Sequence, residues 1–243
     1  MNICVFGDSV AKGVVFDETK NRYSFLKENF IALVQAATAV QFKNYAKFGC
    51  TASKGEEIME KETGKLTEYS YTILEFGGND CDMNWAAISE SPDEIHDPQV
   101  PLDKFRECYV TMIRKTIEAG SHPILLSLPP LDPIRFFDWI SKDLNRQNIM
   151  KFLGNDVNNI YKWHAAYNDM VFTLADEYGL PVVDIRKEFL DRINYSGLLS
   201  IDGMIHWIWN HNASGVFVEE MFCRHRARQA WNSARNHDIF CQP

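Results

Sequence analysis

The chain has 243 residues, of which 46% are hydrophobic and 24% are charged, proportions that exclude disordered and fibrous proteins. Its 33 acidic and 25 basic residues give a net charge of −8, so the surface repels phosphate and we expect no nucleic-acid partner. No apolar run reaches the roughly 20 residues that a membrane span needs. The six cysteines include no CxxC pair and no metal-ligand spacing, so we expect free thiols, no metal and a cytoplasmic location.

Segments with strand-like and helix-like patterns alternate along the chain. Short apolar runs that end in turns predict strands, and apolar residues at helical spacing predict helices. In chain order we predict strand 2–6, helix 23–37, strand 40–45, helix 53–62, strand 71–76, helix 102–119, strand 123–128, helices 133–152 and 156–178, strand 180–185 and helix 213–234. The first segment has no basic residues before its apolar run, which favours a buried strand over a secretory signal.

The alternation predicts a three-layer α/β/α fold with a central, mostly parallel five-stranded sheet. No repeat or linker-like stretch divides the chain, so we expect one domain over residues 1–243. We expect a helical insertion around 132–160 and a carboxyl-terminal helix around 213–235.

Polar, glycine-bearing turns follow the first three predicted strands. Ligands of open parallel sheets bind at the carboxyl ends of the strands, where the strand order reverses, so these turns should converge. A serine hydroxyl, glycine amides and an asparagine amide are the parts of a nucleophile with an oxyanion hole. The three turns are Gly7-Asp8-Ser9, Gly49-Cys50-Thr51 and Gly77-Gly78-Asn79-Asp80.

A base and its orienting carboxylate are predicted near the carboxyl terminus. Asp202 and His206 are four residues apart, so one helical turn would place both on the same face. The segment follows the fifth predicted strand and therefore returns to the same edge of the sheet. The resulting chain order is Ser, Asp, His.

Four ordered blocks resemble those of the SGNH, or GDSL-type, serine hydrolases. The resemblance covers residues 3 to about 215 and implies the flavodoxin-like fold of that family and hydrolysis of esters without a cofactor. The first three blocks are the three turns named above. The second block extends over Asn44-Tyr45-Ala46-Lys47-Phe48-Gly49-Cys50-Thr51. The fourth block is the Asp202-Gly203 pair with His206.

The resemblance also implies roles for individual residues. Ser9 would be the nucleophile, His206 the general base and Asp202 its orienting carboxylate. The backbone amides of Ser9 and Gly49 and the side chain of Asn79 would bind the oxyanion. The family usually has two residues between the Asp and the His, whereas this chain has three, so His211 is the alternative base.

The substrate class follows less directly from the sequence than the reaction does. We predict an esterase acting on O-acetyl groups of a carbohydrate or oligosaccharide, because Trp207 and Trp209 flank the predicted base. A lysophospholipase or acyl-thioesterase is the alternative, which an apolar groove lined by the segment 136–163 would favour. A third interpretation is a catalytically silent binding protein on the same scaffold, because of the extra residue between Asp202 and His206. As a separate alternative, Ser9 could simply cap the first helix. Whether copies of the chain form a homo-oligomer stays open.

Overall fold

The computed structural model describes residues 1–17, 20 and 22–196. Five parallel strands form its central sheet: β1 (Asn2–Gly7), β4 (Gln41–Asn44), β5 (Tyr71–Glu75), β6 (His122–Leu126) and β7 (Val182–Val183). The strand order is β4–β1–β5–β6–β7, so β1 and β5 are neighbours although about seventy residues separate them. A short antiparallel hairpin of β2 (Val14–Asp17) and β3 (Arg22–Phe25) forms a second sheet.

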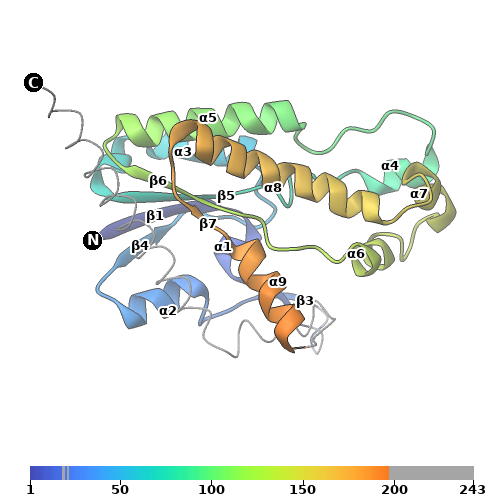
Figure 1. Ribbon diagram of the computed structural model, residues 1–243, viewed down its shortest axis with the longest axis horizontal. Coiled ribbons are helices and arrows are strands. Elements are labelled where there is room, and N and C mark those ends of the chain that lie inside the picture. The colour runs from blue at the N-terminus through green and yellow to red at the C-terminus, as the bar shows by residue number, and fades with distance from the viewer. Residues whose placement is uncertain (18–19, 21, 197–243) are drawn as a thin grey trace, which may run out of the picture.

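Helices cover both faces of the central sheet, which confirms the predicted α/β fold (Figure 1). One face carries α3, α5 and α8, and the other carries α1, α2 and α9. The helices are α1 (Ser9–Lys12), α2 (Phe30–Ala37), α3 (Ala52–Glu62), α4 (Trp85–Glu90), α5 (Leu102–Glu118), α6 (Pro133–Ile140), α7 (Arg146–Phe152), α8 (Asn158–Tyr178) and α9 (Ile185–Ser196), with a 3-10 turn at Thr63–Glu68.

The sheet separates two apolar cores because side chains of each strand alternate between its faces. In β1, Cys4 and Phe6 belong to the core under α3, α5 and α8, whereas Ile3 and Val5 belong to the opposite core. All four side chains are buried. A strand buried on both faces has a continuous apolar sequence, which is why this strand is evident from the sequence.

A third cluster of buried side chains lies to one side of the sheet. It is formed by α4, α6, α7 and the start of α8, with Trp85, Phe137 and Ile149 among its members (Figure 1). Helix α6 begins at Pro133 after the capping carboxylate of Asp132, which accepts hydrogen bonds from Ile134 N and Arg135 N. Of these helices, α6, α7 and α8 lie between β6 and β7, where the sequence predicts helices over 133–152 and 156–178.

Several details of the predicted elements are wrong. The predicted helix 133–152 is divided into α6 and α7, and the predicted strand 180–185 is reduced to β7, because α9 begins at Ile185. The predicted helix 23–37 is a strand followed by a shorter helix, because residues 22–25 pair with β2 and α2 begins only after its cap, Asn29. Helix α3 begins at Ala52, one residue before the predicted start, because Thr51 caps it and its Oγ1 accepts a hydrogen bond from Lys54 N.

Within the described residues, no helix has both the length and the apolar character needed to cross a membrane. The described cysteines Cys4, Cys50, Cys81 and Cys108 are free thiols.

Candidate active site

The strand order reverses between β1 and β5, and the turns that follow these two strands lie side by side. Gly7 is in register with Glu75, so the chain leaves both strands at the same level. The segment after β4 reaches the same edge, since Lys47 N donates a 3.1 Å hydrogen bond to Gly7 O. The structure therefore brings Ser9, Gly49 and Asn79 to one edge of the sheet.

Ser9 is the first residue of α1, directly after the end of β1. Asp8 caps this helix, because its Oδ1 accepts a 2.7 Å hydrogen bond from Val10 N. The half-buried Ser9 makes no side-chain hydrogen bond with any described residue. The capping role proposed as an alternative for Ser9 thus belongs to its neighbour, and the hydroxyl of Ser9 is left for other partners.

The carboxyl group of Glu75 fixes the backbone on both sides of Ser9. Its Oε2 accepts hydrogen bonds from Asp8 N at 3.1 Å and from Ala11 N at 3.3 Å. A Cβ atom at Gly7 would lie 2.7 Å from the same oxygen, so a larger residue there would displace the carboxyl group. Glu75 had no predicted role, because a single acidic residue at the end of a strand carries no signal in the sequence.

Asn79 connects the three converging segments. Its Nδ2 donates to Asp8 Oδ2 at 2.9 Å and to Cys50 O at 3.1 Å. An amide nitrogen has two hydrogens, so these acceptors occupy both of them. An oxyanion that binds at Nδ2 must therefore take the place of one of the two.

Gly49 lies beside this network and has a left-handed backbone, with φ of 64°. No atom lies within 4 Å of the position that a Cβ would occupy, so space does not restrict the residue. The backbone conformation, which side chains other than glycine rarely adopt, explains the glycine.

Three buried carboxyl groups surround Ser9 and Asn79, and no described lysine or arginine pairs with them. Burial raises the pKa of Asp8 to about 6 and that of Asp80 to about 7. Burial and the charge of Asp8 hold the pKa of Glu75 well above its usual value. Asp80 Oδ1 accepts a hydrogen bond from Ala52 N at 2.7 Å, whereas its Oδ2 has no hydrogen-bond partner among the residues that the structure describes. The site therefore retains protons near neutral pH.

A pocket of about 190 Å³ adjoins this cluster at Gly78. A Cβ at Gly78 would lie 3.7 Å from Asp8 Oδ2, so one residue of the pocket lining lies close to the residue that precedes Ser9. The walls of the pocket are largely apolar and come from the loop after β5, α4, the loop after β6, α6 and α8. They include Trp85, Leu131, Phe136, Ile160 and Trp163, together with the ring of His164.

The remaining predicted site residues Asp202, His206 and His211 lie outside the described residues, so their roles stay predictions. Within the described part of the chain, no cluster of three or more His, Cys, Asp or Glu side chains could bind a metal ion.

Comparisons with known proteins place the chain among ester hydrolases. The model of the GDSL-like lipase/acylhydrolase family matches residues 5–207. No curated protein sequence matches the chain significantly.

Solved structures share the fold at low sequence identity. A lipase/acylhydrolase from Enterococcus faecalis is 18% identical, with a TM-score of 0.54 over 86% of this chain and 95% of that one. The esterase EstA from Pseudoalteromonas is 12% identical, with a TM-score of 0.54 over 96% and 98%. The acetyl xylan esterase AlAXEase is 16% identical, with a TM-score of 0.53 over 81% and 83%.

Proposed function

Because the chain belongs to the GDSL-like lipase/acylhydrolase family and is a carboxylic ester hydrolase, we propose that it cleaves esters with Ser9 as the nucleophile. The observation that supports this most is that the hydroxyl of Ser9 has no hydrogen-bond partner among the described residues and lies at the same edge of the sheet as Asn79 and Gly49. These groups come from three separate segments, and the hydrogen bonds of Asp8 and Glu75 fix their arrangement.

The proposed reaction proceeds through an acyl-enzyme. His206 takes the proton of Ser9 while the oxygen attacks the ester carbonyl, and Asp202 orients the imidazole ring. The amides of Ser9 and Gly49 and Nδ2 of Asn79 donate to the developing oxyanion. Collapse of this intermediate breaks the bond to the alcohol, which leaves with the proton from His206. Water then attacks the acyl-enzyme by the same route and releases the acid.

The pocket supports an acyl group longer than acetyl. Its volume of about 190 Å³ corresponds to roughly six water-sized groups, at about 30 Å³ each. Phe136, Ile160 and Trp163 come from the segment whose apolar lining was expected for the thioesterase or lysophospholipase alternative. We therefore propose short acyl chains of about four to six carbons, because burial of each methylene contributes about 0.8 kcal/mol.

The O-acetyl carbohydrate ester stays as the second candidate substrate. Its support from the sequence is Trp207 and Trp209, which lie outside the described residues. The acetyl xylan esterase mentioned above shares the fold alone with this chain.

Hydrolysis of p-nitrophenyl acetate, butyrate, hexanoate and octanoate tests both substrate proposals and the triad. We expect the highest kcat/KM with butyrate or hexanoate, and loss of activity in Ser9→Ala and His206→Ala. A preference for acetate would favour the carbohydrate ester. Activity in His206→Ala together with its loss in His211→Ala would place the base at His211. If the wild type hydrolyses none of these esters, the short-acyl proposal fails.

A further inference from the structure

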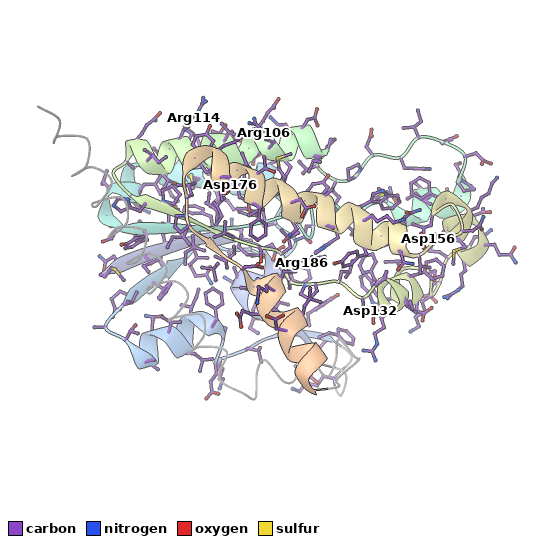
Figure 2. The ribbon with its side chains drawn as sticks, viewed as in Figure 1. Arg106, Arg114, Asp132, Asp156, Asp176 and Arg186 are labelled. Atoms are coloured by element: carbon purple, nitrogen blue, oxygen red, sulfur yellow. The ribbon has the colours of Figure 1, made fainter. Side chains whose placement is uncertain are left out.

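Arg186 is a buried cation that forms no ion pair with any described residue. It lies at the start of α9, beside α8, and only 7% of its surface is exposed (Figure 2). Its guanidinium lies 4.8 Å from the centre of the Tyr161 ring, and Nη1 contacts His164. Nη2 has no hydrogen-bond partner in the described part of the chain. A buried charge is costly without compensation, so this arrangement calls for an explanation.

The contact with Arg186 determines which nitrogen of His164 carries a hydrogen. Arg186 Nη1 lies 3.1 Å from His164 Nδ1. A guanidinium can only donate, so Nδ1 is the acceptor and the hydrogen of the neutral ring is on Nε2. Burial and the charge of Arg186 lower the pKa of His164 to about 3, so the ring stays neutral at physiological pH. His164 is therefore a hydrogen-bond donor with a fixed orientation.

The donor nitrogen of His164 has no described partner, and the residue lines the pocket. Nδ1 faces Arg186, whereas Nε2, on the other side of the ring, has no hydrogen-bond partner among the described residues. Among the described side chains, only Asp80 and Arg186 have a polar atom that is fully buried and lacks a hydrogen-bond partner. Nε2 of His164 lacks a partner but is not one of these fully buried atoms, so it is partly accessible to solvent. The neighbouring carboxylate of Asp82 accepts instead from Trp85 Nε1, at 2.7 Å. A bound group that fills this pocket thus meets an unused donor among apolar walls.

We propose that His164 is a specificity-determining residue, whose Nε2 donates a hydrogen bond to an oxygen carried by the acyl chain of the substrate. Arg186 is a positioning residue that fixes the ring and its tautomer, and its positive charge favours an electron-rich oxygen nearby. The substrate class is then an ester of a short oxo- or hydroxy-substituted acid. This inference rests on the proposed function, because it concerns the acyl group in the pocket beside Ser9.

Paired esters of equal chain length test the proposal. The pairs are p-nitrophenyl pentanoate with 4-oxopentanoate, and p-nitrophenyl hexanoate with 5-oxohexanoate. For at least one pair we expect the wild type to prefer the oxo ester about tenfold in kcat/KM, mostly through KM, as one hydrogen bond allows. His164→Phe should lose this preference, which is measured within each variant as the ratio of kcat/KM for the oxo ester to that for the plain ester. His164→Gln should recover the preference for the oxo ester, since the amide of glutamine retains a hydrogen-bond donor. Equal preference in the wild type and His164→Phe would overturn the proposal.

A binding measurement separates failure of this inference from failure of the proposed function. Trp85 and Trp163 line the pocket, so their fluorescence should report binding of methyl esters to the Ser9→Ala variant. We expect methyl 4-oxopentanoate or methyl 5-oxohexanoate to bind more tightly than its plain counterpart, and the difference to vanish in Ser9→Ala/His164→Phe. This result is expected even if the wild type proves inactive on the p-nitrophenyl esters. Equal affinities for the oxo and plain esters would overturn the proposal, whatever the activity. Thermal unfolding of each variant shows whether it is folded.

Discussion

The side chain of Asn79 donates a 2.9 Å hydrogen bond to Asp8 and thereby connects the turn after β5 to the residue that precedes Ser9. Asp8 also caps α1 through its other oxygen, so one carboxylate fixes both the start of the helix and the orientation of the amide. The proposed nucleophile, Ser9, and the proposed oxyanion donor, Asn79, are therefore positioned by the same group.

Replacement of Asn79 by alanine should lower kcat by about 10²- to 10³-fold, as expected when one oxyanion donor is removed. Steady-state kinetics with p-nitrophenyl butyrate measures this effect. Asn148→Ala is the matched control, because Asn148 Nδ2 donates a comparable 2.8 Å hydrogen bond to Ser89 O in the distant helical cluster. Equal loss of activity in both variants would show that the effect comes from general destabilisation.

Glu75 should contribute to stability through its acceptor oxygen more than through its charge. Glu75→Gln retains an oxygen for Asp8 N and Ala11 N, so the free energy of unfolding should change by less than about 1 kcal/mol. Glu75→Leu leaves two buried N–H groups unpaired and should lower the free energy of unfolding by about 2–5 kcal/mol. Urea denaturation distinguishes the variants. A strongly destabilised Glu75→Gln would indicate that the ionised form is required.

The raised pKa of Asp80 predicts that stability decreases as the pH rises. The folded state binds the proton up to about pH 7, whereas an unfolded aspartate releases it near pH 4. The stabilisation that the folded state gains by binding the Asp80 proton is therefore complete below about pH 4 and is lost as the pH rises to about 7. Asp80→Asn stays neutral and keeps an acceptor for Ala52 N, so its stability relative to the wild type should increase between pH 5 and pH 8. A pH-independent difference would contradict this prediction.

Enlargement of the pocket should shift the preferred acyl length. Phe136 contributes to the pocket wall, and its replacement by alanine opens additional apolar space. We expect the ratio of kcat/KM for octanoate to that for butyrate to rise about tenfold. Ile134→Ala is the control on the same helix, because this side chain is exposed to solvent and does not line the pocket. An unchanged ratio in Phe136→Ala would exclude the pocket as the acyl site.

Strand β1 could be predicted because Ile3–Phe6 is a continuous apolar run that ends in a glycine-bearing turn. The hairpin of β2 and β3 could not, since Phe25 continues the helical spacing of α2 and only its pairing with Val14 places it in a strand. Local spacing alone does not distinguish these two structures.

Ser9, Gly49 and Asn79 could be named as candidate site residues from the sequence, because each lies in a short turn whose residues are contiguous in the chain. Glu75, Arg186 and His164 had no predicted role, because each matters only through contacts across the fold. His164 does lie four residues after Ile160, on the buried face of α8. A histidine on an apolar helix face is most often a core residue, so this spacing gave no functional signal.

The role of Ser9 as nucleophile is tested most directly by mass spectrometry after reaction with a fluorophosphonate probe, which traps an activated serine covalently. We expect one modified peptide that contains Ser9, together with loss of labelling and of ester hydrolysis in Ser9→Ala. Ser70→Ala, at the opposite end of β5, should label and hydrolyse like the wild type. Labelling of another serine, or ester hydrolysis that persists in Ser9→Ala, would contradict Ser9 as the nucleophile.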